Sequence, residues 1–210
     1  MERKKRSYDP ATLRERVLDV TAAAFQEAGY NATAMHDIVR AAGTTGGALH
    51  HHFPTKKALG LAVIRHRVAT AVEEAWIAPM EKAADTAGGV RDAFGAIIAE
   101  LEEKGAVSGC PLNNLALELS CRDADFRAAV DAVFARWRQA IADKLRQDAT
   151  VDEACRRDAD ATATFVIACY SGAMAMAKAS QSTAPLETCA ARLAAFLRGG
   201  ARSGPAGRRR

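Results

Sequence analysis

Residues 33–53 read Thr33-Ala-Met-His-Asp-Ile-Val-Arg-Ala-Ala-Gly43-Thr-Thr-Gly-Gly-Ala-Leu-His-His-His-Phe53 and carry the strongest structural signal in the chain. They divide into two short helical segments, about 34–42 and 45–51, joined at Gly43. Glycine permits the positive φ of a tight turn, and the alanines before it are small where two helices must approach closely. Two short helices with such a turn predict a helix-turn-helix.

The second of these helices separates a buried face from an exposed one. Leu49 and Phe53 lie four residues apart, so both are expected to fill the space between the helices. Gly46, Gly47, Ala48 and His50 are then left facing outward. Thr33 and Thr45 precede the two helices, where threonine is a favoured capping residue.

Outward from this motif, apolar residues recur at helical spacing, and strand signals are scarce. Asp9 and Pro10 suit the start of a first helix over about 10–28, which Gly29 ends. Thr55 suits the start of a helix to about Ala75. Further helices are predicted at about 87–104, 110–121, 123–148, 152–180 and 186–198. The predicted fold class is therefore all-α, with about nine helices.

Charge is unevenly distributed along the chain. Residues 1–67 hold 11 basic and 6 acidic side chains, whereas the remaining 143 hold 18 and 19. A basic module beside a near-neutral one suggests a polyanionic partner for the first. We predict a DNA-binding domain over residues 1–55, a second helical domain over 56–200, and a disordered basic tail over 201–210.

The cysteines and the termini indicate a cytoplasmic protein. The five cysteines are odd in number and widely spaced, which fits reduced thiols. No secretory signal follows the basic N-terminus, and the uncharged stretch 161–177 is short for a membrane span. His50, His51 and His52 point about 100° apart on a helix and are not expected to share a metal ion. We expect no metal, no cofactor and no membrane partner.

The motif and its surroundings resemble the TetR/AcrR family of repressors. The resemblance implies an all-helical homodimer in which a helical ligand-binding and dimerisation domain, here residues 56–200, controls two DNA-binding heads. It covers about residues 10–60, in the right order and spacing. The residues that carry it are Gly29-Tyr30, Thr33, Ile38, Ala42-Gly43, Gly47 to Phe53 and Lys56-Lys57-Ala-Leu59.

Docking the second helix in the major groove assigns roles to individual residues. Lys56 is expected to grip a phosphate, and the basic arm around Arg6 to reach a neighbouring groove. His50 stands where the family usually has a phosphate-contacting tyrosine, which leaves its contact open. Gly46 and Gly47 offer little base readout, so specificity is expected from Thr44, Ala48, His51 and DNA shape. The predicted DNA contacts are Arg6, Thr33, Thr44, Thr45, Gly46, Gly47, Ala48, His50, His51 and Lys56.

The second half contains Gly109-Cys110-Pro111 followed by Leu115-Ala-Leu-Glu118. This pattern resembles a TetR-like subgroup that responds to small, often reactive or aromatic compounds. Pro111 suits a first helical turn, so Cys110 lies at a helix N-terminus that favours thiolate. Two interpretations stay open, namely a sensor of electrophiles or oxidants and a small apolar residue packed in a tight loop.

A ligand site is expected among the middle helices, as in other helical bundles. Trp137 is the favoured wall residue because a large amphipathic ring suits a pocket. For every candidate a place in the core is an equal alternative. The candidates are Phe94, Ile98, Cys110, Asn113, Asn114, Phe134, Trp137, Tyr170 and Met174.

Helices at about 157–180 and 186–198 are predicted to form the homodimer interface, and burial within one subunit is the alternative. The small residues Ala161, Ala168, Gly172, Ala173 and Ala177 permit close packing. Phe165, Val166, Leu193, Phe196 and Leu197 add apolar area.

The function predicted is a ligand-responsive repressor that a small molecule releases from its double-stranded DNA operator. A thiol sensor using Cys110 and a transcriptional activator are the alternatives. An enzyme is not expected, because nucleophile-elbow, zinc-protease and phosphate-loop motifs are missing.

Overall fold

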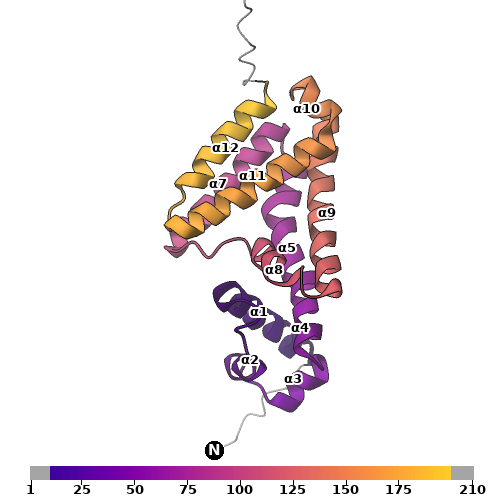
Figure 1. Ribbon diagram of the computed structural model, residues 1–210, viewed down its shortest axis with the longest axis vertical. Coiled ribbons are helices and arrows are strands. Elements are labelled where there is room, and N and C mark those ends of the chain that lie inside the picture. Colours follow the sequence, from indigo (N-terminus) through magenta and orange to yellow (C-terminus); the bar gives the residue numbers. More distant parts are fainter. Residues whose placement is uncertain (1–9, 200–210) are drawn as a thin grey trace, which may run out of the picture. The chain divides into compact units, whose positions relative to one another are not determined.

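The computed structural model describes residues 10–199, and every regular element among them is a helix (Figure 1), which confirms the predicted all-α class. Arg6, Asp9 and the predicted tail at 201–210 lie outside the described residues. The elements are α1 (Pro10–Ala28), α2 (Met35–Ala41), α3 (Gly46–His52), α4 (Lys56–Val63), η1 (Ile64–Val68), α5 (Ala69–Val72), η2 (Glu73–Ile77), α6 (Ala78–Lys82), α7 (Thr86–Lys104), α8 (Pro111–Leu119), α9 (Ala124–Gln147), α10 (Glu153–Arg157), α11 (Ala159–Ser180) and α12 (Ala184–Leu197).

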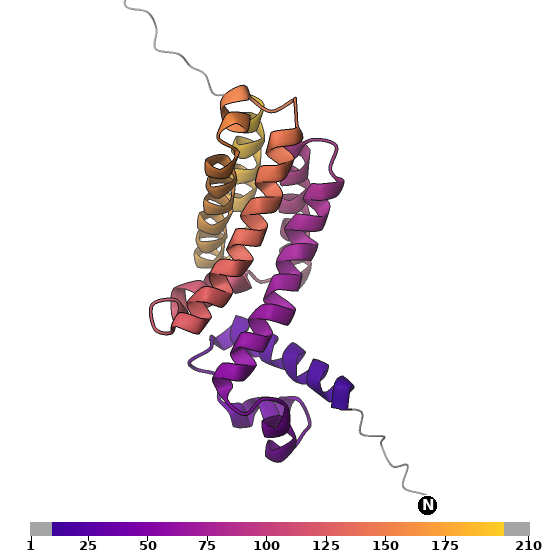
Figure 2. The same ribbon diagram turned by 90° about the vertical axis from the view of Figure 1, so that its right-hand side faces the viewer.

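The chain forms two compact units. The first unit combines the chain up to Ala71 with Pro111–Asp131, and the second combines Val72–Cys110 with the chain from Ala132 onward. In the first unit α1 packs on α2, α4 and η1, and Figure 2 shows α1, in indigo, crossing the purple helix of α4 and η1. In the second unit α12 packs on α7 and α11, and these three helices run side by side in Figure 1.

The core of the first unit is built from the residues that the sequence pattern indicates. Ile38, Leu49 and Phe53 are buried, as predicted. Gly29 and Gly43 take positive φ values of 86° and 59°, which lets each helix end in a tight turn. The turn at Gly29 separates α1 from α2, and the turn at Gly43 separates α2 from α3.

Three threonines were expected to cap helices, and two of them do. The hydroxyl of Thr45 accepts from the Ala48 amide at 3.2 Å, and that of Thr55 accepts from the Ala58 amide at 3.0 Å. The prediction for Thr33 was wrong. Ala34 is the N-cap of α2 and gives no side-chain cap. The Thr33 hydroxyl instead donates to the carbonyl of Gly29 at 2.7 Å, because the end of α1 offers it an acceptor.

The helix that follows the motif is longer than predicted. It runs from Lys56 to Lys82 and contains two π-helical segments, η1 and η2. The helix was predicted to end at about Ala75, and it continues past that residue and through Pro79. Proline lacks an amide and crowds the preceding turn. The wider π-helical turn of η2 directly before Pro79 relieves that conflict.

The predicted single helix over 152–180 is two helices. α10 ends at Arg157, and Asp158 takes a non-helical φ of −111° and ψ of 58° before α11 begins. The α10 segment is held in part by the Thr162 hydroxyl, which donates to the Cys155 carbonyl at 3.0 Å. The break turns the chain so that α10 and α11 are separate elements.

A buried carboxylate, Asp148, joins two helix ends in the second unit. Asp148, 8% exposed, accepts from the Thr86 amide at 2.6 Å and from the Thr150 amide and hydroxyl at 2.9 and 2.6 Å. Burial raises the pKa of Asp148, but the hydrogen bonds from Thr150 and Thr86 outweigh it and lower the pKa to about 2. The carboxylate thus joins the start of α7 to the end of α9.

We expect Asp148→Asn to lower the free energy of unfolding by about 2 kcal/mol at pH 7, measured by urea denaturation. The pKa is lower in the folded chain than the ordinary value near 4, so the stabilisation is full above that value. It is lost as the pH falls from about 4 through about 2. The difference between variant and wild type should therefore shrink over this range. Asp131→Asn, at an exposed position of α9, is the control, and an equal loss in both variants would contradict the role of Asp148.

Candidate DNA-binding head and ligand unit

The outer surface of α3 is bare at its first turn. Gly46 and Gly47 are exposed, and a Cβ added at either would meet no atom within 4 Å. His50 and His51 are exposed farther along the helix, while Thr44 and Ala48 are half-buried. The amides of Gly46 and Gly47 can therefore approach a phosphate closely, since these two residues carry no side chain.

The histidines of α3 do not converge. The rings of His51 and His52 lie 5.5 Å apart at 68°, and His50 is exposed. Among residues 10–199 no group of three His, Cys, Asp or Glu side chains lies close enough together to hold a metal ion.

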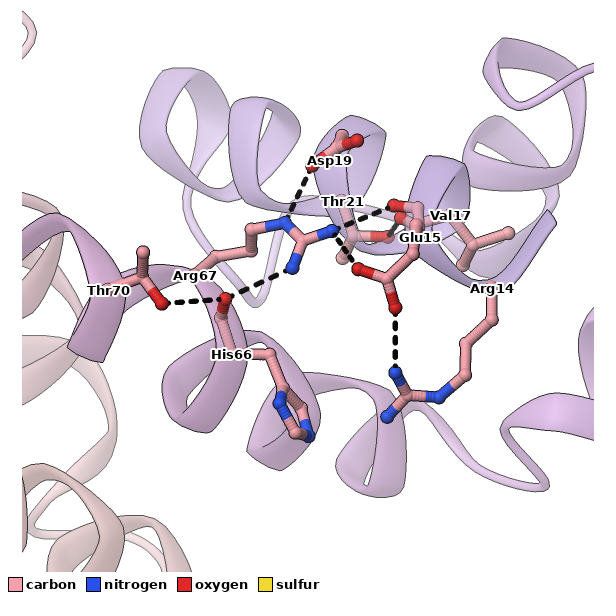
Figure 3. A network of polar contacts seen from close by, with 8 residues as sticks. All are labelled: Arg14, Glu15, Val17, Asp19, Thr21, His66, Arg67 and Thr70. Carbon is pink, nitrogen blue, oxygen red and sulfur yellow. Dashed lines mark hydrogen bonds and ion pairs between the residues drawn. The ribbon is translucent and has the colours of Figure 1, made fainter. Parts of the chain in front are cut away.

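An arginine fixes α1 against the long helix of the first unit (Figure 3). Arg67 of η1 donates through Nε to Asp19 at 2.6 Å and through Nη2 to the Glu15 carboxylate at 2.8 Å. Its Nη1 donates to the carbonyl of His66, and Arg14 holds the other oxygen of Glu15 at 3.0 Å. The two carboxylates and the guanidinium set the crossing of α1 over η1.

Lys56 is half-buried and contacts the loop after α1. Its ammonium donates to the carbonyl of Asn31 at 3.3 Å and lies 4.5 Å above the centre of the Tyr30 ring. Burial lowers the pKa of Lys56, although the Glu118 carboxylate opposes this. Thr33, another predicted DNA contact, is 5% exposed with its hydroxyl bonded to Gly29, so this structure does not offer it to a phosphate.

Lys57 is held by two carboxylates. Its ammonium lies 2.7 Å from Asp123 and 2.7 Å from Asp125. Hydrogen bonds to Asp123 and Asp125 raise the pKa of Lys57 to about 12. The beginning of α9 is thereby tied to the beginning of α4, within the first unit.

Glu118 of α8 organises the loop after α1, and the sequence did not indicate this role. Its carboxylate accepts from the amide of Tyr30 at 2.8 Å and from the amide of Asn31 at 2.6 Å. The Tyr30 ring packs edge-on against Phe126 at 5.1 Å. A Cβ at Gly60 would lie 2.8 Å from the Tyr30 ring, so a glycine is needed there. These contacts make α8 part of the unit that carries the helix-turn-helix.

Four aromatic side chains meet in the core of the second unit. Trp76 has its ring centroid 5.5 Å from that of Phe94 and 5.0 Å from those of Trp137 and Tyr170. Phe134 stacks on Trp137 at 6.3 Å with an interplanar angle of 10°. We call Trp76, Phe94, Trp137 and Tyr170 the aromatic cluster. Trp76 was not among the predicted ligand residues.

The other predicted ligand residues divide between the units. Met174 is buried and Ile98 and Phe134 are half-buried in the second unit. Asn113 and Asn114 belong to α8 in the first unit, where the Asn114 amide donates to Gln26 at 3.3 Å. The structure thus brings the aromatic candidates together but not the two asparagines.

Cys110 ends the second unit's first segment, directly before α8. Its side chain is 5% exposed and lies near the Tyr170 hydroxyl. Burial raises the pKa of Tyr170 well above its usual range, and Cys110 raises it further. Cys110 directly precedes the first residue of α8, as predicted, but its thiol has little access to solvent.

One face of α11 and α12 remains apolar and open. Phe165 and Met176 are 46% and 63% exposed, and the rings of Phe165 and Phe196 lie 5.2 Å apart. Ala161, Ala168 and Gly172 of the predicted interface are exposed as well. The other predicted members, Val166, Ala173, Ala177, Leu193 and Leu197, are buried within the unit.

No helix among residues 10–199 has both the length and the apolar character that a membrane span requires.

Comparison with known proteins covers both units. Residues 17–63 match the family of bacterial regulatory proteins called tetR, and residues 86–192 match the C-terminal domain of LmrA/YxaF-like transcriptional regulators. The transcriptional repressor DhaR of Mycobacterium sp. strain GP1 is 26% identical over 184 residues, which are 83% of this chain and 87% of DhaR. The regulator LmrA of Bacillus subtilis is 24% identical over 82% of this chain and 90% of LmrA.

Solved structures agree with the family match. A TetR transcriptional regulator from Chloroflexus aurantiacus shares 29% identity with a TM-score of 0.76, over 90% of this chain and 95% of that one. NemR of Escherichia coli in its reduced form, at 20% identity and a TM-score of 0.74, shares the fold. The match over residues 86–192 spans just over half of the chain, and the resemblance seen in the helix-turn-helix is confirmed. The chain belongs to the TetR family of transcriptional regulators.

Proposed function

We propose that this chain is a homodimeric operator-binding repressor that a small molecule releases from DNA. The observation that carries the proposal is the bare first turn of α3, where Gly46 and Gly47 leave backbone amides free to meet a phosphate. His50, His51 and the half-buried Thr44 and Ala48 flank this turn and supply the remaining candidate contacts. Such a regulator acts on the chromosome, in the cytoplasm.

The proposed division of labour places DNA binding in residues 1–55 and ligand binding with dimerisation in 56–200. The helix from Lys56 to Lys82 would couple the two functions, because Arg67 anchors α1 while Trp76 belongs to the aromatic cluster. A ligand that favours one of two arrangements of the heads needs a coupling of only about 1–3 kcal/mol.

Dimerisation through α11 and α12 is part of the proposal. Phe165 and Met176 are large apolar side chains exposed on α11, and Phe165 lies against Phe196 of α12. Exposed apolar patches mark sites of protein–protein contact. Ala168 and Gly172 lie exposed on α11 and permit a second helix to approach closely. Two heads in one dimer would then read two half-sites of an operator.

Repression is favoured over activation by the naming of DhaR as a repressor. A thiol sensor at Cys110 is less well supported, because its 5% exposure limits attack by electrophiles.

Gly47→Glu should weaken binding to the chain's own upstream DNA at least about tenfold, measured by fluorescence anisotropy. The carboxylate would face phosphates, and like charges brought together in an interface are strongly unfavourable. Folding should persist, since the position has open space and an acidic residue suits a helix start.

The control is Gly95→Glu on α7, an exposed helical glycine with the same open space. It should bind as the wild type does. Equal affinity of the two variants would contradict DNA docking by α3.

Ala168→Glu should convert the dimer to a monomer and raise the dissociation constant at least about 100-fold, because an unpaired charge would be buried in the interface. Sedimentation velocity measures the change. Ala132→Glu, at an exposed position of α9, should leave the dimer intact. A dimer that survives Ala168→Glu places the interface elsewhere.

A further inference from the structure

Two half-buried thiols, Cys169 and Cys189, lie on a pair of packed helices in the second unit. α11 and α12 are joined by only three residues, 181–183, so they run antiparallel and side by side (Figure 1). The rings of Phe165 on α11 and Phe196 on α12 lie 5.2 Å apart. This contact fixes which residues of the two helices lie at the same level.

The helical repeat places both thiols in the seam that these two rings mark. Cys169 follows Phe165 by four residues, and Cys189 precedes Phe196 by seven. Residues four or seven apart lie on one face of a helix. Because the helices are antiparallel, both steps run toward the turn at 181–183. At a rise of about 1.5 Å per residue, the levels of the two cysteines differ by about 4.5 Å along the seam.

The two thiols also influence each other electrostatically. Burial raises the pKa of Cys169, and the Cys189 thiol raises it further. Such an effect requires the two sulfurs to be near each other, because electrostatic interactions weaken with distance. The other cysteines are placed differently, since Cys110 and Cys155 are buried and Cys121 is exposed in the first unit.

We propose that Cys169 and Cys189 form a redox-active dithiol that a peroxide closes to a disulfide between α11 and α12. Packed helices have axes about 8–10 Å apart, and side chains in the seam approach more closely than that. A disulfide requires Cβ atoms about 4 Å apart, so closing the bond needs a rotation of the thiols or a small slide of one helix. The proposal goes beyond operator binding and assigns a modification site to the two helices of the proposed dimer face.

The reaction balances with hydrogen peroxide as the oxidant. The thiolate of one cysteine attacks a peroxide oxygen, the O–O bond breaks, and a sulfenic acid and a water molecule form. The other thiol attacks the sulfenic sulfur, the S–S bond forms, and the hydroxyl leaves as a second water molecule. Two electrons pass from the sulfurs to the peroxide, and both thiol protons end on the water molecules.

Peptide mapping of the full chain after treatment with hydrogen peroxide tests the dithiol. Trypsin cuts after Arg157, Lys178 and Arg192, so the two thiols fall in separate peptides, 158–178 and 179–192. After the remaining thiols are blocked with iodoacetamide, these two peptides should be recovered joined, and a reductant should separate them. Because the two thiols are held near each other, this link should exceed that of any other cysteine pair at least about tenfold.

Matched variants and the exposed Cys121 provide the controls. Cys189→Ser should abolish the link and leave Cys169 as a sulfenic acid, which dimedone traps, whereas Cys121→Ser should leave the link unchanged. The peroxide concentration is raised until Cys121 is oxidised. Unjoined peptides at that point would overturn the proposal, as would a link between two chains, which a non-reducing gel shows as a doubled mass. The map of the wild-type chain decides the matter even if a variant fails to fold.

Chain concentration and operator binding separate this inference from the proposed function. A dimer through α11 and α12 would shield the seam, so dilution until sedimentation velocity shows a monomer should speed the link at least about threefold. A link that forms equally fast in dimer and monomer would support the dithiol and contradict the proposed dimer face. Operator binding by a chain that yields no joined peptides would support the proposed function and overturn the dithiol.

Discussion

One helix, from Lys56 to Lys82, contributes buried side chains to the cores of both units. Leu59 and Val63 are buried in the first unit, and Trp76, Ile77 and Met80 are buried in the second. A helix has one register, so the side chains at its two ends cannot be repositioned independently. The two π-helical segments, η1 and η2, locally change that register, and they carry Arg67 and Trp76. Such segments are frequent at functional sites.

Polar contacts in the first unit join segments that lie far apart in the sequence. Glu118 holds the amides of Tyr30 and Asn31, and Lys57 holds Asp123 and Asp125, so α8 and the start of α9 belong with the helix-turn-helix. Cys110 directly precedes α8 in the chain. A displacement near Cys110 would thus act on a helix that is bonded to the loop between α1 and α2. Coupling in this family member is proposed to use both this helix and the helix from Lys56 to Lys82.

Local signals explain which features the sequence predicts well. The turn at Gly43, the caps at Thr45 and Thr55 and the burial of Leu49 depend on residues within one turn of helix, so pattern and propensity suffice. The cap at Thr33 was wrongly predicted because its hydroxyl could either accept from an amide of α2 or donate to the carbonyl of Gly29. It donates to Gly29. Glu118 and Trp76 were missed because their partners, except Phe94, are 61 or more residues away, and no local pattern encodes such contacts. The apolar stripes that contain Phe94 and Trp137 were predictable, but the meeting of both rings with Trp76 was not.

We propose that two α3 helices of a dimer read one operator. Hydroxyl-radical footprinting of the upstream DNA tests it most directly, because it maps each protected backbone position. The account predicts two protected half-sites on one face of the duplex, with centres separated by about one helical turn of 10 base pairs or a multiple of it. A single protected half-site at saturating protein, or uniform protection without periodicity, would contradict it.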